Sequence, residues 1–316
     1  MNKFFVKIFI LLIPLIVGIV IIVFFPLPAN SYDLVIIDKH RILANTKSPK
    51  IVLAGGSNLA FGIDSMEIKD KLNFPVVNTG VQQGFGLGRI LDDISRFLHK
   101  RDVLLIIPEY NHFTSTWNGN IAAYELILDV RQYQLLLASY YGLPNGFSQY
   151  FSMKYDILKQ TVRQSIRQIN TQNENPLMYS RNGFNEYGDN VKHLGMENQP
   201  FKPAGNLGVL NQSYLNSFFR LVDNFTKRGI MVMLSYPSYE EQSFRNSAAL
   251  IQELDILFRA KENLLVISAP ESYCYPAEYF YDSVYHLNRE GRATRTNQLI
   301  LDLQSSGFFV IDETLR

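Results

Sequence analysis

The sequence predicts an α/β protein: a three-layer sandwich around a parallel sheet of about five strands, preceded by one N-terminal transmembrane helix. Short apolar runs that stop at glycine or proline alternate with longer segments of helical period, which is typical of a parallel sheet with right-handed crossovers. An unbroken apolar run occupies residues 8–25. The 316 residues carry a net charge of +1, so nothing indicates a nucleic-acid partner.

The N-terminal segment is predicted to anchor the chain in a lipid bilayer. Lys3 and Lys7 precede the apolar run 8–25, and a proline pair at 26–28 ends it. Eighteen uncharged residues can just cross the hydrocarbon core as a helix. The lysines before the run predict a cytoplasmic N-terminus and an extracytoplasmic domain at the cell membrane. The alternative is a cleaved signal peptide, for which Leu27-Pro28-Ala29 is a poor cleavage site.

Three segments follow from this interpretation. A cytoplasmic stub and transmembrane anchor (1–28) leads into a spacer (29–49), and the remaining chain (50–316) forms the extracytoplasmic domain.

The first half of this domain alternates strands and helices. Each expected strand is a short apolar run bounded by turn residues. One helix opens with a capping box at Asp64-Ser65-Met66-Glu67 and extends to about Leu72, and the next has apolar residues at helical spacing. The expected order is strand 51–54, helix 64–72, strand 75–77, helix 87–99 and strand 102–107.

The second half contains a long stretch without a clear period. Residues 170–212 are rich in asparagine, glycine, proline and aromatic residues. A loop of this length predicts either a functional lid or an unrecognised element. The elements expected around it are helices 122–141, 151–169, 211–228, 243–261 and 288–305, with strands 230–234 and 264–267.

The strand 51–54 supplies a candidate nucleophile. It stops at Gly55-Gly56, and Ser57 and Asn58 follow at once. Ligands of open α/β sheets bind at the carboxyl ends of the strands, and paired glycines allow the backbone to turn sharply there. Ser57 is therefore the candidate nucleophile, and the alternative is an ordinary Gly-Gly-Ser turn.

A serine nucleophile needs a base to accept its proton. Among the five histidines, His286 stands out because Asp282 lies just upstream and a helix follows it. An imidazole held by a carboxylate is the arrangement that fixes its tautomer in serine hydrolases. The alternative is a surface histidine in a helix-capping loop. His40 and His99 are expected at the solvated surface, and His112 follows the third strand.

These motifs together resemble the SGNH (GDSL-like) hydrolase superfamily, which has a flavodoxin-like fold. Gly55-Gly56-Ser57-Asn58 stands at the first family motif, with Gly56 where an aspartate is usual, and Gly84 stands at the second. The resemblance covers roughly residues 50–305. It implies that Ser57 is the nucleophile, His286 the base and Asp282 its orienting carboxylate. It also implies an oxyanion hole formed by the N–H groups of Ser57 and Gly84 and by an asparagine side chain.

The chain departs from the family pattern at two places. After the third strand, Pro108-Glu109-Tyr110-Asn111-His112-Phe113 replaces the usual Gly-x-Asn-Asp. Asn111 is the nearest candidate for the third oxyanion donor, with Glu109 or Tyr110 facing the site as the alternatives. Asp282 lies four residues before His286 rather than three. In this superfamily a backbone carbonyl can take the third role of the triad.

The closest similarity is to membrane-anchored bacterial members with a Gly-Gly-Ser-Asn start and a Tyr-His-Leu-Asn end, often encoded beside surface-polysaccharide genes. This resemblance implies a membrane-tethered serine esterase or O-acyltransferase that acts on ester bonds, such as O-acetyl groups of a glycan, alongside polysaccharide-assembly proteins. Hydrolysis and transfer both stay open. The alternative function is a catalytically inactive scaffold that binds a glycan or a partner protein in an export or assembly complex.

Other motifs give fewer indications. The spacing of Gly84, Gly86 and Gly88 does not match a dinucleotide loop. Asp189 and His193 are two possible metal ligands, which do not make a site. No cofactor or metal is expected, and a single cysteine, Cys274, excludes an internal disulfide. The candidate substrate contacts are Asn58, Glu109, Tyr110, Tyr179, Arg181 and Asn185.

Overall fold

The computed structural model describes residues 2–24, 30–119 and 178–308, and six isolated positions between the last two ranges (152, 154, 155, 158, 159 and 162). The chain divides into two compact units. One contains Tyr32–Ile121 and Ser180–Arg316, and the other contains Met1–Ser31 and Ala122–Tyr179. Apart from those isolated positions, the predicted helices 122–141 and 151–169 lie outside the described residues.

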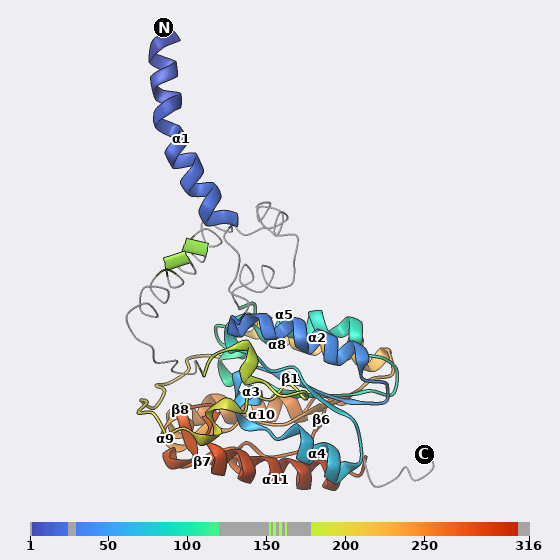
Figure 1. The fold of residues 1–316 in the computed structure, drawn as a ribbon. Coiled ribbons are helices and arrows are strands. Elements are labelled where there is room, and N and C mark those ends of the chain that lie inside the picture. The colour runs from blue at the N-terminus through green and yellow to red at the C-terminus, as the bar shows by residue number, and fades with distance from the viewer. Residues whose placement is uncertain are drawn as a thin grey trace. The chain divides into compact units, whose positions relative to one another are not determined.

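The unit that begins at Tyr32 is built on a five-stranded parallel sheet of order β2-β1-β3-β4-β6, which confirms the predicted α/β class (Figure 1). Every residue of β1 and β3 is buried, as expected for strands with both faces covered. All five carboxyl ends meet at one edge of the sheet, because the strands are parallel. The strands are β1 (Ile51–Gly55), β2 (Val76–Asn78), β3 (Val103–Ile107), β4 (Met231–Leu234) and β6 (Leu265–Val266).

Helices cover both faces of this sheet. Figure 1 shows α2, α5 and α8 on one side, with α4 and α11 on the other. α10 packs on α8 through the rings of Phe258 and Phe218, whose centroids lie 5.6 Å apart. The helices of this unit are α2 (Val35–Asn45), α3 (Ser57–Gly62), α4 (Ser65–Leu72), α5 (Leu87–Ile94), α8 (Gln212–Lys227), α9 (Glu241–Asn246), α10 (Ala248–Arg259) and α11 (Arg289–Ser305).

Polar side chains cap the first turns of α4, α8, α9 and α11. The Asp64 carboxylate accepts a hydrogen bond from the Glu67 N–H at 3.2 Å, so the predicted start of α4 is confirmed. Asn211 caps α8 and Asn288 caps α11 in the same way. The predicted helix 243–261 is instead two helices, because the backbone leaves helical geometry at Ser247.

The predicted spacer contains a helix that packs into the same unit as the sheet. Helix α2 buries Val35, Ile36, Lys39 and Leu43. The Lys39 ammonium donates to the carbonyl oxygens of Asn78 at 3.1 Å, Gly188 at 2.7 Å and Gly80. Burial lowers the pKa of Lys39 to about 7, and Asp189 opposes that shift. Lys39 thus connects α2 to the loop that follows β2.

The part of the predicted lid that belongs to this unit, from Ser180 onward, is tied to the sheet and to α3 by backbone hydrogen bonds. The Asn190 N–H donates to the carbonyl of Ala60 in α3 at 2.8 Å, and the Asn78 N–H at the end of β2 donates to the carbonyl of Tyr187 at 2.9 Å. This segment therefore packs along the edge of the sheet where the candidate site is expected.

The N-terminal run forms helix α1 (Asn2–Phe24), which contains Pro14. In the part of the chain that the structure describes, no helix combines the length and apolarity that crossing a membrane requires.

Candidate active site

The carboxyl ends of β1 and β3 bring Ser57 and Glu109 together. Ser57 is the first residue of α3, directly after β1 and Gly56. A β-carbon added at Gly56 would lie 2.4 Å from Glu109 Oε1 and 3.3 Å from the Cα of Gln83. Only glycine therefore allows the ends of β1 and β3 and the loop after β2 to approach this closely.

The Ser57 hydroxyl donates a hydrogen bond to Glu109 Oε1 at 3.2 Å. The same oxygen accepts from the backbone N–H of Asn58 at 3.0 Å. Glu109 is 1% exposed, and this burial raises the pKa of its carboxyl group. The hydrogen bonds from Asn58 and Ser57 and the charge of His286 oppose the shift. A buried acid thus lies against the candidate nucleophile.

Asn58 lies between this acid and a buried arginine. Arg295 of α11 is 0% exposed, and its guanidinium donates to the Asn58 backbone carbonyl at 2.7 Å and to the Asn58 side-chain oxygen at 3.0 Å. It also donates to the Ser238 hydroxyl at 3.2 Å. Burial lowers the pKa of Arg295 to about 10. The predicted substrate contact Asn58 is fully buried and bonded at both ends to charged side chains.

The predicted base and its carboxylate lie on a short antiparallel hairpin of β8 (Phe280–Ser283) and β9 (His286–Leu287). His286 Nδ1 lies 2.7 Å from Asp282 Oδ1. Ser283 pairs with His286 in the antiparallel hairpin, so the chain reverses between the two strands. Asp282 and His286 can therefore make this contact although they are four residues apart. A proton on Nδ1 that is donated to Asp282 leaves Nε2 as the basic nitrogen.

One ring stack connects the base to the helix of the nucleophile. The His286 ring is parallel to the Phe61 ring of α3, with centroids 4.2 Å apart and an interplanar angle of 14°. Ser57 and Phe61 are four residues apart in α3, so their side chains lie on the same helix face. The stack therefore puts His286 on the face of α3 that carries the Ser57 hydroxyl.

The two candidate oxyanion donors lie in neighbouring loops. Gly84 is exposed in a 3-10 turn, Gln83–Phe85, and Gln83 passes close to Gly56 as described above. Asn111 is half-buried, and its side-chain oxygen accepts a hydrogen bond from the Tyr285 hydroxyl at 3.1 Å. Asn111 thus connects the segment after β3 to the β8–β9 hairpin.

The other candidate substrate contacts are spread more widely. Tyr110 is 2% exposed and packs edge-on against Tyr239. Arg181 forms a two-pronged ion pair with Asp38 of α2 at 2.6 and 2.8 Å. The Asn185 side chain accepts from the backbone N–H groups of Tyr187 and Asp189, and so closes its own turn. Tyr179 is exposed and belongs to the other compact unit.

Asp189 and His193 do not converge on a common point. The Asp189 carboxylate accepts from Ser65 Oγ at 2.6 Å and from the Asn78 amide at 2.8 Å. His193 Nε2 lies 2.9 Å from the carbonyl of Leu287, and burial lowers the pKa of His193 to about 4. Among the described residues no group of three or more histidine, cysteine or acidic side chains could hold a metal ion.

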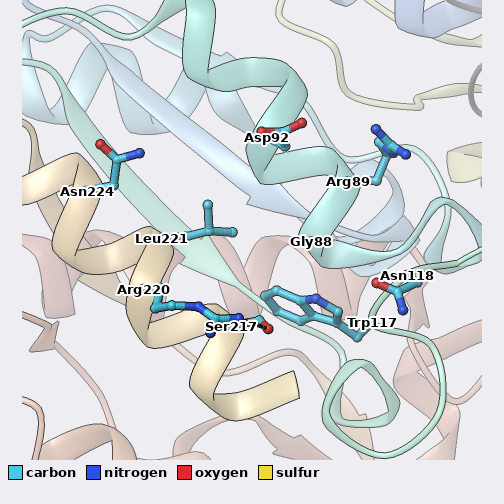
Figure 2. A pocket seen from close by; sticks show the side chains of 9 residues that line it. All are labelled: Gly88, Arg89, Asp92, Trp117, Asn118, Ser217, Arg220, Leu221 and Asn224. Atoms are coloured by element: carbon cyan, nitrogen blue, oxygen red, sulfur yellow. Dashed lines mark hydrogen bonds between the residues drawn. The ribbon is translucent and has the colours of Figure 1, made fainter. Parts of the chain in front are cut away.

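A separate cavity of about 410 Å³ lies between α5 and α8. Figure 2 shows Arg89 and Asp92 on α5 and Arg220 on α8, with the Trp117 indole at its lower side. Polar side chains and one aromatic ring line this cavity, which shares no residue with the Ser57 and His286 cluster. Its lining residues are Gly88, Arg89, Asp92, Trp117, Asn118, Ser217, Arg220, Leu221 and Asn224.

Like Phe61, Arg295 is a member of the cluster that sequence reasoning missed. It lies four and eight residues before Leu299 and Leu303, which are both buried on α11. Four-residue spacing places all three on one helix face, so a buried arginine was predictable from the period of this helix. Its partner Asn58 was not predictable, because 237 residues separate them.

No protein-family model matches the chain, and a search of curated proteins finds no match.

Proposed function

We propose that this protein is a serine esterase or O-acyltransferase of the SGNH type, with Ser57 as the nucleophile, His286 as the base and Asp282 as its orienting carboxylate. The observation that carries the proposal is the contact between α3 and the β8–β9 hairpin. An imidazole bonded to a carboxylate is stacked on the helix face that presents a serine hydroxyl. Covalent acyl transfer by a serine needs a base that can reach its hydroxyl and a group that orients this base, and these are the roles proposed for His286 and Asp282.

In the proposed first step, Ser57 Oγ attacks the carbonyl carbon of an ester. His286 Nε2 accepts the hydroxyl proton as the new bond forms, and Asp282 stabilises the resulting imidazolium. The hydroxyl must first leave Glu109, its hydrogen-bond partner in this structure. Rotation about the Cβ–Oγ bond of Ser57 redirects the proton while Oγ keeps its place, and catalytic hydrogen bonds often form only when substrate is bound.

The negative charge of the tetrahedral intermediate falls on the former carbonyl oxygen. The N–H groups of Ser57 and Gly84 are the proposed donors to this oxygen, and Asn111 is the proposed third donor. Collapse of the intermediate breaks the ester bond, and His286 returns the proton to the leaving alcohol. Water or a sugar hydroxyl then attacks the acyl-enzyme by the same route, which gives hydrolysis or transfer respectively.

The proposed substrate is an O-acylated glycan outside the membrane, such as an O-acetylated surface polysaccharide. We propose that residues 8–25 anchor the protein in the membrane, with the N-terminus in the cytoplasm. The support is in the sequence, where Lys3 and Lys7 precede an uncharged run that ends at a proline pair.

A fluorophosphonate probe tests the catalytic assignment directly. We expect the full-length protein to be labelled, and labelling to disappear in Ser57→Ala and fall at least tenfold in His286→Ala. Ser272→Ala is the matched control, since Ser272 is exposed outside the cluster, and it should be labelled like the wild type. Absence of labelling in the folded wild type, together with no release of acetate from 4-nitrophenyl acetate, would contradict a hydrolase.

The cavity between α5 and α8 favours a second candidate, a non-catalytic glycan-binding scaffold. Its volume is within the range of small-ligand sites, and its amide, guanidinium and carboxylate groups suit sugar hydroxyls. Calorimetry with partially acetylated xylo-oligosaccharides tests this function. Binding by Ser57→Ala that is lost in Arg220→Ala would support the scaffold, and equal binding by both variants would argue against it.

A further inference from the structure

The Glu109 carboxylate occupies the position beside the nucleophile where a side chain of residue 56 would otherwise lie. A β-carbon at Gly56 would be 2.4 Å from Glu109 Oε1 and 2.8 Å from the carboxyl carbon. The same oxygen is 3.2 Å from Ser57 Oγ and 3.0 Å from the Asn58 nitrogen. One carboxylate oxygen therefore contacts both residues at the start of α3.

This carboxylate is part of a buried arrangement of opposite charges. Glu109 accepts from the Asn58 N–H, while Arg295 donates to the carbonyl and the side-chain oxygen of the same residue. Both charged side chains are at most 1% exposed. Hydrogen bonds on both sides of Asn58 thus fix the first turn of α3, including Ser57 directly before it.

We propose that Glu109 is a positioning residue for the nucleophile: its carboxylate holds the Ser57 hydroxyl in the resting site, in the orientation from which His286 takes over the hydrogen bond. This inference rests on the proposed function only in taking Ser57 as the nucleophile. It adds a role for Glu109, and it makes Gly56 and Glu109 alternatives for one position in space. We expect a side chain at residue 56 to fit only where the side chain of residue 109 is shortened, because the β-carbon would otherwise lie 2.4 Å from Glu109 Oε1.

The contact is measurable without any catalysis. In a Cys274→Ser background, Ser57→Cys puts a single thiol beside Glu109, and the rate of iodoacetamide alkylation against pH gives its pKa. A neighbouring carboxylate disfavours the thiolate, so Glu109→Gln should lower this pKa by about 1 pH unit. Asp102→Asn is the matched control, because Asp102 is a buried carboxylate at the opposite end of β3. It should leave the thiol pKa unchanged.

The result decides the inference whichever way the proposed function stands. A thiol pKa that Glu109→Gln does not change, or that Asp102→Asn changes equally, would overturn it. If the wild type is not labelled but the thiol pKa changes as expected, the proposed catalytic function is wrong. The contact between Glu109 and residue 57 is then still supported.

Relocation of the carboxylate gives a second test. Glu109→Ala should slow fluorophosphonate labelling about tenfold, since it frees the hydroxyl and the Asn58 N–H. Glu109→Gln retains an acceptor oxygen and should stay within about threefold of wild type. Gly56→Asp should destabilise the protein when Glu109 is present, but not in the Glu109→Ala background. The Gly56→Asp/Glu109→Ala double variant should also be labelled faster than Glu109→Ala alone. Independent destabilisation by the two substitutions would contradict a shared position.

Discussion

The two halves of the candidate site are held in different ways. On the nucleophile side, residues 57 and 58 are bonded to a buried anion, Glu109 in the segment after β3, and to a buried cation, Arg295 of α11. On the base side, Asp282 and His286 lie on a two-stranded hairpin, with side chains 16% and 10% exposed. The first half depends on long-range burial, and the second depends on a local turn and one ring stack.

This difference teaches where substitutions should act. A buried charge without its partner is costly, so changes on the nucleophile side should appear first in the stability of the whole unit. Asp282 and His286 are held by a local hairpin, and an amide at residue 282 keeps its shape and packing, so changes on the base side should appear mainly in reactivity. The following predictions test this contrast, in order of decreasing effect.

The largest expected effect is that of Arg295→Met. It removes the buried cation that donates to the Asn58 carbonyl and to the Asn58 side-chain oxygen, and leaves both buried acceptors without this donor, which should lower the free energy of unfolding by about 3–5 kcal/mol. Urea titration followed by circular dichroism measures it. Arg289→Met is the matched control on the same helix, because Arg289 is exposed, and it should cost less than about 1 kcal/mol. Equal losses of unfolding free energy in Arg295→Met and Arg289→Met would contradict a special role of buried charges on the nucleophile side.

Asp282→Asn should show the opposite pattern. The amide can orient His286 in the wrong tautomer, so probe labelling should slow about 100-fold, while the free energy of unfolding changes by less than about 1 kcal/mol. Asp223→Asn, an ion-paired surface aspartate of α8, is the control and should leave the labelling rate unchanged. If Asp282→Asn unfolds the protein, the β8–β9 hairpin contributes to the stability of the whole unit. The proposed difference between the two halves of the site would then be wrong.

Two glycine substitutions sharpen the difference within the nucleophile side. Gly56→Ala forces a β-carbon to within 2.4 Å of a buried carboxylate oxygen and should destabilise the protein by about 2 kcal/mol. Gly84→Ala meets only the Gln82 side-chain oxygen at 3.2 Å, which can move, and should cost less than about 0.5 kcal/mol. Thermal unfolding of both variants measures the difference. A cost at Gly84 equal to that at Gly56 would show that the loop, and not Glu109, limits residue 56.

Each half of the site also contains a buried histidine that should make stability depend on pH. His112 Nδ1 accepts from the Glu109 N–H at 3.0 Å, and His193 bonds to the carbonyl of Leu287 in β9. Burial lowers the pKa of His112 to about 3 and that of His193 to about 4. Below about pH 6.5 the unfolded chain binds protons that the folded protein does not, so stability should fall as pH decreases toward 4.

Each of these histidines should contribute about 1 kcal/mol per pH unit over that interval. His112→Gln and His193→Gln should each reduce the slope by this amount, as measured by urea titrations at pH 7, 6 and 5. Tyr281→Phe is the control beside His193 and should leave the slope unchanged. A slope that neither histidine variant reduces would contradict the burial of neutral imidazoles.

The sequence predicted the elements whose signals are local. The apolar runs of β1 and β3, the Asp64 cap of α4 and the helical period of α8 all appear where expected. Ser57 follows β1, and His286 lies beside Asp282, as their positions along the chain indicated. The divided helix at Ser247 was not expected, because the apolar period continues through the break.

Contacts between distant residues set the rest of the site. Glu109 lies 52 residues from Ser57, and Arg295 lies 237 residues from Asn58, so no window of the sequence connects them. The same holds for Lys39, which the sequence put in a spacer and the fold buries against the carbonyls of Asn78 and Gly188. Charged side chains are rarely buried unless they are paired, and the partners become known only with the fold.

By itself, the sequence determined the alternation of strands and helices, the serine after Gly55-Gly56 and the acid four residues before His286. Period, glycine pairs and caps act within a few residues, so they can be recognised along the chain. Only the tertiary structure decided that a glutamate from the segment after β3 fills the space beside Gly56 and contacts the Ser57 hydroxyl, and that Phe61 brings His286 to the same helix face. These contacts exist because parallel strands end at one edge of the sheet, where their loops compete for the same space.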